Sequence, residues 1–470
     1  MSDGLAAIVG RLGTPRILVL GDLILDRYVW GDVQRVSPEA PVQILNVRRE
    51  EARLGGASNV VANLSALGAK VSCGGVVGRD EAGDELRALL RRNRADVKAV
   101  VRDPRKPTSV KTRMIAHNQQ MLRVDRERTE AIAPDVQKRL LAAALKAAAG
   151  ADLAIVSDYN KGTLPAAFCE RFIRGARCPV LVGLKSRDYR KYRRATGASL
   201  NRSEVLLISK EDEVDAAARK VLRELELRFL IVTLGEKGIR VYSRDAAPVS
   251  LPALARQVYD VTGAGDTALA AFALGYASRL SLEECALLSN AAAGVVVAKV
   301  GTETVTRAEL LAQAGQHRKI LRLPALKRAL AAERARGRRI VFTNGCYDLL
   351  HAGHASTLDF SRAQGDCLVV GLNTDRSVRR LKGEGRPLVP QAERARLLAA
   401  LEAVDYVVLF EEDTPAKLVK ALRPDVLVKG EDYRGKEVVG REHAGRVALA
   451  PMVKGLSTTD LLRRIRDDGH

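Results

Sequence analysis

Short apolar runs alternate with amphipathic or alanine-rich stretches along most of this 470-residue chain. Runs such as RILVLGD, ADLAIVSDY, PVLVGLK and RFLIVTLGEKG end in polar or glycine-containing turns, which is typical of parallel strands followed by helices. The pattern begins again at Arg338 with RRIVFTNG, then DCLVVGLNTD, VDYVVLF and DVLVKGEDY. It predicts an α/β protein with two separate parallel sheets, each covered on both faces by helices.

The stretch between the two sheets is charged, helix-prone and without a strand signal, and Pro324 interrupts it. We place the domain junction there and predict a first domain over 1–315, a linker over 316–335 and a second domain over 336–470. Such a linker would let two sites work independently.

The composition fits a folded protein without membrane segments. Hydrophobic residues make up 47% and charged residues 28% of the chain, which excludes disordered and collagen-like classes. The most apolar stretch covers only 291–300, against the roughly 20 residues that cross a bilayer. The first residues lack the apolar core of a secretory signal, and the six cysteines form no C-x-x-C pair. We expect a cytoplasmic protein with reduced thiols.

The formal net charge of +21 would suit a polyanionic partner. The arginines, however, are spread through helical segments such as RALLRRNRADVK and LLRRIR, without interleaved aromatic residues or a basic tail. Solvated helix faces explain such a distribution, so we expect neither a nucleic acid nor a membrane as partner. Phosphorylated small substrates would also suit this positive field.

The motif Asp260-Val-Thr-Gly-Ala-Gly-Asp266-Thr precedes an alanine-rich helix. Gly263 and Gly265 allow the backbone to close around a phosphate, and the amides at the helix start can stabilise a transferred phosphoryl group. Asp266 would then accept the proton of an attacking sugar hydroxyl. The alternative is a glycine-rich turn with a capping aspartate.

Other small and polar groups follow predicted strands, where open α/β sheets bind their ligands. Asp22 and Asp26 follow the first strand, and a Leu-Gly-Gly-Ala-Ser-Asn run at 54–59 precedes a helix. Asn201 and Glu204 could hold Mg²⁺ through water near nucleotide phosphates. N-x-x-E is also a common capping arrangement.

The strings GDLILDRY, LGGASNVVANLSALGA, VTLGEKG and DVTGAGDT together resemble the ribokinase family of sugar kinases, over nearly all of residues 1–315. Further strings, RVSPEAPV, NQQMLRVD, VSDYNKG and AAAGVVVAKVGTETV, resemble the kinase half of the bifunctional heptose kinase/adenylyltransferase family of lipopolysaccharide precursor synthesis. The resemblance implies a ribokinase-like αβα sandwich. It assigns Asp266 as the catalytic base and Gly263, Ala264 and Gly265 as the anion hole. It implies ATP contacts at Asn201, Arg202, Ser203, Glu204, Lys185, Gly235 and Gly238, with magnesium at Asn201 and Glu204. It places Asp22, Asp26, Gly55, Gly56 and Asn59 in the sugar site.

Two motifs depart from the usual kinase pattern. Where such kinases read V-D-P-K, this chain has Val182-Gly-Leu-Lys185, and the usual T-P-N is Ser199-Leu-Asn201. The missing aspartate removes a carboxylate near the phosphates while leaving Lys185, Asn201 and the predicted base in place.

In the second domain, His351 and His354 lie three positions apart at the start of a predicted helix and share one face. Two imidazoles in one space can stabilise negative charge on an α-phosphate under attack. A metal site or a pair of ordinary surface histidines are the alternatives. Upstream, Thr343, Asn344 and Gly345 could offer amides to phosphates. Near the end of the chain, Ser457 and Thr458 precede the last predicted helix and could hold a departing pyrophosphate.

These features resemble the nucleotidyltransferase family with an H-x-G-H motif, which implies a Rossmann-like domain with a parallel sheet. GLNTD, RRLKG, FEEDTP and VKGEDY resemble the adenylyltransferase half of the same bifunctional family. The implied chemistry is direct attack by a sugar 1-phosphate on the α-phosphate of ATP, with Lys382 and Arg394 as candidates for charge neutralisation. Glu431 replaces a glycine of the usual K-G-G-D-Y pattern.

The resemblance predicts two reactions: phosphorylation of D-glycero-β-D-manno-heptose 7-phosphate at O1, and formation of ADP-heptose from heptose 1-phosphate. A separate phosphatase must act between them, because the first product carries two phosphates. We also expect a homo-oligomer, in the simplest case a homodimer. The alternatives are another sugar phosphate, CTP in place of ATP, or a basic nucleic-acid-binding protein built on degenerate enzyme domains.

Overall fold

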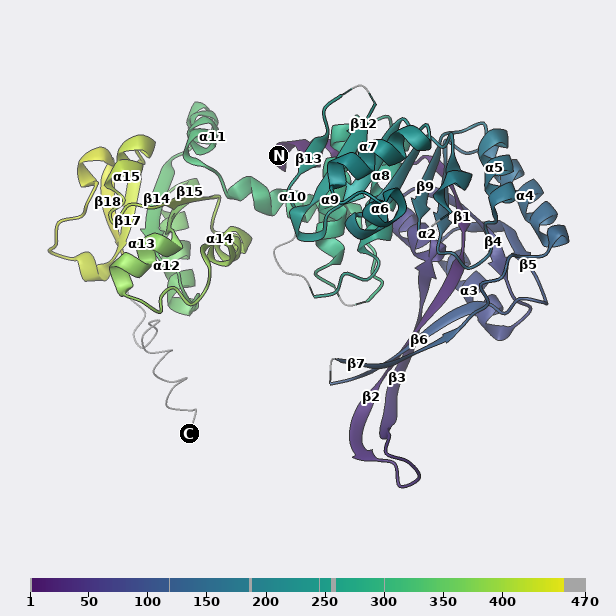
Figure 1. The fold of residues 1–470 in the computed structure, drawn as a ribbon. Coiled ribbons are helices and arrows are strands. Elements are labelled where there is room, and N and C mark those ends of the chain that lie inside the picture. Colours follow the sequence, from purple (N-terminus) through teal and green to yellow (C-terminus); the bar gives the residue numbers. More distant parts are fainter. Residues whose placement is uncertain are drawn as a thin grey trace. The chain divides into compact units, whose positions relative to one another are not determined.

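The computed structural model describes residues 2–117, 119–185, 188–244, 246–254, 259–299 and 301–451, which form two compact units (Figure 1). The first unit extends to Leu311 and the second begins at Ala312. Each contains its own largely parallel sheet between helices, which confirms the predicted fold class. Among the described residues, no helix is both long and apolar enough to span a bilayer.

The first unit is built on a nine-stranded sheet with the strand order β13-β12-β11-β10-β9-β8-β1-β4-β5. The strands from β11 to β5 are parallel, and β12 and β13 run antiparallel at one edge. Their bounds are β1 (Arg16–Gly21), β4 (Lys70–Val77), β5 (Asp96–Arg102), β8 (Leu153–Asp158), β9 (Val180–Leu184), β10 (Gly197–Asn201), β11 (Phe229–Thr233), β12 (Ile239–Ser243) and β13 (Val249–Leu251).

Helices cover both faces of this sheet, as buried strands require. One layer holds α4 (Pro134–Ala148), α5 (Ala166–Gly175), α6 (Arg202–Ser209) and α7 (Val214–Glu224). The other layer includes α2 (Ala57–Ala66), α8 (Ala264–Ala277) and α9 (Leu282–Val296), with α8 packed against both α2 and α9. Helix α8 is buried from Thr267 to Gly275 and contacts β8 and β9 in the middle of the sheet. The remaining helices of this unit are α1 (Ser2–Arg11) and α3 (Glu81–Arg92), with short 3₁₀ turns at Tyr189–Tyr192 and Gly235–Lys237.

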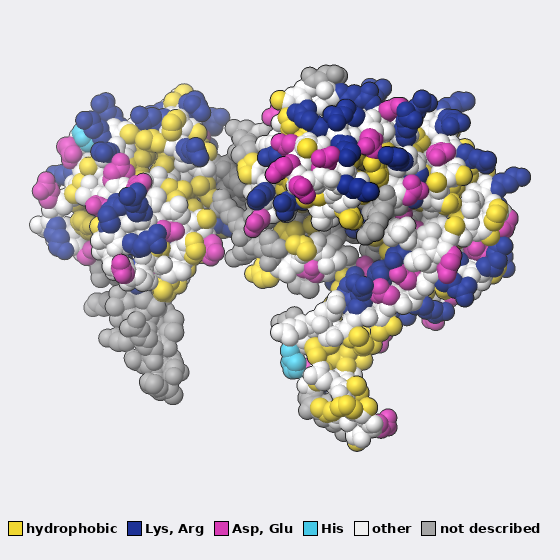
Figure 2. All heavy atoms as spheres, in the orientation of Figure 1, with side chains coloured by type: hydrophobic (Ala, Val, Ile, Leu, Met, Phe, Trp, Pro, Cys, Tyr) yellow, Lys and Arg dark blue, Asp and Glu magenta, His cyan; other side chains and the backbone are white. Residues whose placement is uncertain are grey.

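A second, four-stranded sheet with the order β3-β2-β6-β7 extends from the first unit as an arm (Figure 1). Its strands are β2 (Leu23–Val36), β3 (Gln43–Gly56), β6 (Ser109–Ala116) and β7 (Gln119–Arg126). The outer part of the arm exposes apolar side chains, which gather on it in Figure 2. On the same view, Lys and Arg side chains lie interspersed with Asp and Glu over the surface of each unit.

The second unit has a five-stranded, fully parallel sheet with the order β16-β15-β14-β17-β18. The strands are β14 (Ile340–Gly345), β15 (Cys367–Asn373), β16 (Tyr406–Phe410), β17 (Val426–Gly430) and β18 (Arg446–Ala450). Alternate strand residues feed two cores: Val341 and Val370 pack with α12 (Ala352–Ala363) and α14 (Gln391–Ala400), whereas Phe342 and Val369 pack with α11 (Leu323–Ala335) and α15 (Ala416–Leu422). The unit also contains α13 (Asp375–Lys382) and 3₁₀ turns at Glu431–Tyr433 and Arg441–His443.

The segment predicted as a linker, 316–335, lies within the second unit. Helix α10 (Arg307–Lys319) crosses the boundary between the units, and Ile320 then pairs with Val407 of the second sheet. In α11, Leu326 and Leu330 are fully buried in the second core. The sequence predicted the helical tendency of this segment but not its packing, because only a few apolar positions, one turn apart, anchor α11 in the core.

Candidate active sites

A cavity of about 750 Å³ opens at the carboxyl ends of the parallel strands in the first unit. Lys185 follows β9, Asn201 ends β10 and Thr233 ends β11, and all three side chains line it. The first turn of α8 closes another side with Gly263, Ala264, Gly265 and Asp266. The predicted anion hole and base thus meet the predicted nucleotide contacts in one cavity.

Gly263 starts α8 in a left-handed conformation, with φ of 79°, that favours glycine. The amide of Thr267 is the first to bond back along the helix, to the carbonyl of Gly263. The amides of Gly265 and Asp266 therefore have no intrahelical acceptor, as at the start of any helix. Together with the helix dipole they favour an anion at this end.

The Asp266 carboxylate is held by two donors. Asn59 donates from Nδ2 to Oδ2 at 3.0 Å, and the Tyr159 hydroxyl donates to Oδ1. Asn63 donates to the Asn59 side chain at 3.1 Å and accepts from Thr267 at 3.0 Å, so a buried polar network ties α2 to α8. Burial raises the pKa of Asp266, while Lys185 and the two donors lower it. A buried carboxylate with a raised pKa is suited to act as a general base.

Neither Asn59 nor Asp22, both predicted to contact the sugar, lines the cavity. The Asn59 amide binds the Asp266 carboxylate, as described above. The Asp22 side chain is buried and accepts the backbone amides of Tyr159, Lys161 and Thr163, at 2.8, 3.0 and 3.3 Å. Asp22 thus fixes the loop after β8. Burial raises its pKa, and the nearby Asp158 raises it further.

Of the other predicted sugar-site residues, Asp26 and Gly56 line the cavity. Asp26 is buried and forms an ion pair with Arg113 at 2.7 Å. Gly55 does not line the cavity. A Cβ there would lie 2.3 Å from the Asp26 carboxylate, so this glycine makes room for Asp26.

Asn201 and Glu204 form a capping box at the start of α6. Asn201 Oδ1 accepts the Glu204 amide at 2.8 Å and the Ser203 hydroxyl at 2.7 Å, and Glu204 Oε2 accepts the Asn201 amide at 2.7 Å. The capping arrangement, which was the alternative expected for this N-x-x-E motif, is therefore present. The two functions are compatible, because Asn201, Arg202 and Ser203 also line the cavity and Glu204 lines a smaller hollow that shares Lys185 and Asp266 with it.

Glu204 can also serve a divalent cation. The capping box uses only the Oε2 atom of Glu204. Burial raises the pKa of Glu204, and the negative charge of Asp266 raises it further. A second carboxylate near the first favours a positive charge between them. Among the described residues no cluster of three or more metal-binding side chains occurs, so such an ion would rely mainly on water and phosphate oxygens.

The two predicted glycines after β11 differ. Gly235, with φ of 60°, lines the cavity. Gly238 does not, and its φ of 91° turns the chain into β12, where a Cβ would lie 2.1 Å from the Leu251 carbonyl oxygen. We therefore assign Gly238 a structural role.

The missing aspartate at position 183 has a packing explanation in this chain. A Cβ on Gly183 would lie 2.6 Å from Cδ2 of Leu269, so Leu269 occupies the space that a larger residue needs. Both residues line the small hollow beside Lys185.

Four charged or aromatic cavity residues were not proposed for the site from the sequence. Tyr159 and Arg123 were quoted only within family strings, and Lys111, Arg113 and Arg123 come from the strands β6 and β7 of the arm. Basic side chains along a strand pair were a usable signal, but nothing in their spacing placed the arm beside the nucleotide loops.

A cavity of about 500 Å³ lies at the carboxyl ends of β14, β15 and β17 in the second unit. Thr343, Asn344 and Gly345 from β14, Lys382 from α13 and His354 from α12 line it, as predicted for a single site.

The two predicted imidazoles stack, with ring centroids 3.9 Å apart and planes at 27°. His351 precedes α12 and supports His354, which lines the cavity. The Nδ1 atoms of both are buried without a hydrogen-bond partner, although buried polar atoms are usually paired. Burial, His351 and Lys382 lower the pKa of His354 to about 4, and burial also lowers the pKa of His351. The lowered pKa values favour the neutral form of both imidazoles, and a neutral imidazole keeps one N–H donor.

Lys429 is a cavity residue that was not singled out from the sequence. It is the penultimate residue of β17, donates from Nζ to Asn344 Oδ1 at 2.6 Å and lines the same cavity as His354. Burial lowers its pKa to about 8, with Asp432 opposing the shift. A buried ammonium that shares one cavity with Lys382 favours phosphate ligands.

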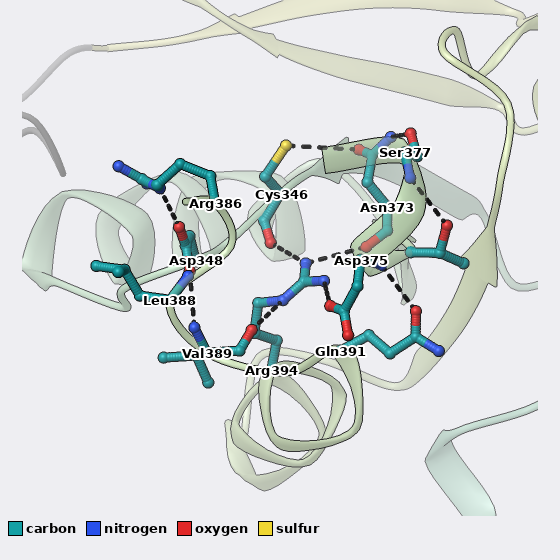
Figure 3. Close-up of polar contacts among 11 residues, drawn as sticks. Cys346, Asp348, Asn373, Asp375, Ser377, Arg386, Leu388, Val389, Gln391 and Arg394 are labelled. Atoms are coloured by element: carbon teal, nitrogen blue, oxygen red, sulfur yellow. Dashed lines mark hydrogen bonds and ion pairs between the residues drawn. The ribbon is translucent and has the colours of Figure 1, made fainter. Parts of the chain in front are cut away.

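Arg394 has a structural role instead of the predicted charge-neutralising one. Its side chain is fully buried, forms an ion pair with Asp375 at 2.7 Å and donates to the carbonyls of Cys346, Asn373 and Val389 (Figure 3). It therefore joins α14 to the ends of two strands and does not line the cavity.

Three further positions of the second unit were singled out from the sequence: Glu431, Ser457 and Thr458. Glu431 does not line the cavity, and its carboxylate pairs with Arg434 at 2.7 Å. The glutamate that replaces the usual glycine therefore does not occupy the cavity. Ser457 and Thr458 lie outside the described residues.

Comparisons with known proteins agree with this two-site architecture. Residues 14–309 match the pfkB family of carbohydrate kinases, and residues 342–464 match a cytidylyltransferase-like family. The chain is 47% identical over 468 residues to a protein of Geotalea uraniireducens named bifunctional protein HldE, with 96% of each chain covered. A protein of the same name from Wolinella succinogenes is 45% identical, with 96% of this chain and 98% of that protein covered.

Solved structures support the fold of the first unit. Arabidopsis thaliana ribokinase, complexed with ribose and ATP, has a TM-score of 0.52 at 19% identity and covers 64% of this chain and 99% of its own. Phosphofructokinase-2 from Escherichia coli has a TM-score of 0.54 at 16% identity, with 64% of this chain and 98% of its own covered.

Proposed function

The chain belongs to the family of bifunctional HldE proteins, and from that premise we propose how its two cavities divide the work. The first unit is a sugar kinase that phosphorylates D-glycero-β-D-manno-heptose 7-phosphate at O1. The second is a nucleotidyltransferase that makes ADP-heptose for lipopolysaccharide core precursors. The observation that carries this assignment is that each unit holds its own cavity at the carboxyl ends of its sheet, one built around a buried carboxylate and the other around stacked imidazoles.

In the first cavity, Asp266 takes the proton from the O1 hydroxyl while that oxygen bonds to the γ-phosphorus of ATP and ADP leaves. The amides of Gly265 and Asp266 stabilise the charge on the transferred group. Lys111, Arg113 and Arg123 line the same cavity and supply positive charge for a phosphorylated sugar.

The ATP of a kinase is used with a divalent cation, which neutralises phosphate charge, and we propose Mg²⁺. Glu204 would hold it through water, using the carboxylate oxygen that the capping box leaves free. The side-chain oxygen of Asn201 already accepts two hydrogen bonds, one of them from the Glu204 amide. Asn201 would therefore position Glu204.

In the second cavity, a phosphate oxygen of heptose 1-phosphate bonds to the α-phosphorus of ATP and pyrophosphate leaves. His354, supported by His351, donates to the charged phosphate, while Lys382 and Lys429 neutralise it. We propose that Ser457 and Thr458 contact the leaving phosphates. Between the two reactions a separate phosphatase must remove the 7-phosphate, because the kinase product carries two phosphates and the transferase uses the 1-phosphate. We propose that both reactions take place in the cytoplasm, where ATP and phosphorylated sugars are available.

We also propose that the protein is a homodimer. The arm exposes Val47, Met121, Leu122 and Val124 at 51%, 42%, 54% and 47%, and a second copy of the same sheet would cover them. Light scattering of the intact protein should give twice the chain mass, and Leu122→Asp should reduce it to that of one chain.

Product analysis tests the assignment directly. With ATP, Mg²⁺ and heptose 7-phosphate, the expected product is the 1,7-bisphosphate, and ADP-heptose should form only after a phosphatase that removes the 7-phosphate is added. ADP-heptose without phosphatase, or no bisphosphate, would contradict it.

Replacing ATP by CTP in the second reaction tests the alternative nucleotide, and pyrophosphate release with CTP alone would favour it. Other sugar phosphates in the first reaction test the alternative sugar in the same way. The intact cavities argue against a degenerate nucleic-acid-binding protein.

A further inference from the structure

The hydroxyl of Tyr159 contacts the carboxylate of Asp266, the proposed kinase base. Tyr159 Oη donates to Oδ1 of Asp266, while Asn59 occupies Oδ2 at 3.0 Å. An ionised carboxylate has about four acceptor positions. Two donors, one on each oxygen, therefore fix its plane and still leave lone pairs for a substrate proton.

Tyr159 is itself held on two sides. Its amide donates to Asp22 Oδ2 at 2.8 Å, in the loop that Asp22 binds with three hydrogen bonds. Its ring lies 4.4 Å from the Lys185 ammonium, a cation–π contact on the cavity wall. Tyr159 and Asp266 both line the main cavity and the small hollow beside Glu204.

We propose that Tyr159 is a positioning residue of the kinase: its hydroxyl orients the Asp266 carboxylate toward the sugar hydroxyl. The proposal rests on the kinase function assigned to the first unit. Burial and the charge of Asp266 raise the pKa of Tyr159, so the phenol stays protonated and remains a donor. Asp22 contributes through Tyr159, which gives this buried aspartate a part in catalysis without contact with the substrate.

A purely structural phenol provides the contrast. Tyr192 also donates its hydroxyl to a buried carboxylate, that of Asp158, next to the same loop. Tyr192 is fully buried and does not line the kinase cavity. Removing either hydroxyl removes one hydrogen bond to a carboxylate. Only the carboxylate bound by Tyr159 is the proposed catalytic base.

The test compares Tyr159→Phe with Tyr192→Phe in the full-length protein. For Tyr159→Phe the kinase kcat should fall about 10- to 100-fold, because a misplaced reacting group costs rates of that order. KM for ATP and for heptose 7-phosphate should stay within about twofold, because the hydroxyl acts on the base and not on bound substrate. For Tyr192→Phe both constants should stay within about twofold even if the melting temperature falls.

In each variant, adenylyl transfer reports that the second unit is intact, and calorimetric binding of heptose 7-phosphate reports that the kinase cavity is formed. In an Asp266→Asn background, Tyr159→Phe should lower the kinase kcat little further, because both substitutions affect the same catalytic carboxylate. An unchanged kcat in Tyr159→Phe, an effect confined to KM, or an equal loss in Tyr192→Phe would overturn the proposal. Full kinase activity in Asp266→Asn would instead refute the assigned base, and with it the proposed kinase mechanism.

Discussion

The two cavities share a position in their folds and differ in the chemistry of their polar groups. Both open at the carboxyl ends of parallel strands, with a helix start beside them. In the first, a buried carboxylate is satisfied by two donors. In the second, two imidazoles leave buried Nδ1 atoms without partners.

The difference follows from what each reaction moves. A kinase must remove a proton from a neutral hydroxyl, which requires a base of raised pKa. Adenylyl transfer uses a phosphate nucleophile that is already ionised, so the site needs donors and cations for the charge on the α-phosphate. The same fold position therefore carries an acceptor in one unit and donors in the other.

The largest expected effect comes from Asp266→Asn. The amide cannot accept the sugar proton, so kinase turnover should fall by about 10² to 10⁴, with adenylyl transfer unchanged. Separate assays of ADP release and pyrophosphate release on one preparation measure both. An equal fall in the two rates would show that the sites are not independent.

His354→Ala should produce the opposite pattern. Loss of a donor to the α-phosphate should lower adenylyl transfer by about 10² to 10³ and leave the kinase unaffected. His443→Ala is a matched control, because His443 does not line the second cavity. If the control loses as much activity, the assignment of His354 is wrong.

Arg394→Met separates structure from chemistry within the second unit. Removing the guanidinium leaves Asp375 and three carbonyls without their donor, and breaking a buried pair costs about 3–5 kcal/mol of unfolding free energy. When both activities are followed during denaturant unfolding, the variant should lose adenylyl transfer at a lower denaturant concentration than the wild type. Its kinase activity should be lost at the wild-type concentration. A fully stable variant with weakened ATP binding would restore the role expected from the sequence.

Lys429→Met should lower adenylyl transfer about tenfold, which corresponds to roughly 1.4 kcal/mol of lost phosphate stabilisation. Lys436→Met provides the control, because that lysine is exposed and does not line the cavity. Indistinguishable rates for the two variants would remove Lys429 from the site.

The smallest effect is a difference in pH dependence. Asp266 must be ionised to act, and burial raises its pKa, so kinase turnover should decline on acidification at a higher pH than an ordinary aspartate would give. His354, with a pKa of about 4 before ligand binds, does not change charge from neutral pH to about pH 5. When both rates are measured over one pH series, the kinase rate should therefore fall before the adenylyl-transfer rate as the pH is lowered. A decline of both rates over the same acidic range would contradict this prediction.

Local patterns were enough to identify the fold class and the residues at strand ends and helix starts. Asp266, the glycines before it and His354 follow from motifs in which a turn, a helix start and a reactive group are neighbours in sequence. Such groups need only local backbone geometry to come together.

Contacts between distant segments were decided by the tertiary structure alone. Asn59 meets Asp266 across 207 positions and Tyr159 across 107, and the arm brings Arg113 to Asp26 across 87. Arg394 was assigned to the ligand because an arginine's charge can be read from the sequence, whereas its burial cannot. Side-chain burial and long-range pairing depend on how sheets and helices pack, so the same residue type neutralises a phosphate in one place and joins a helix to two strands in another.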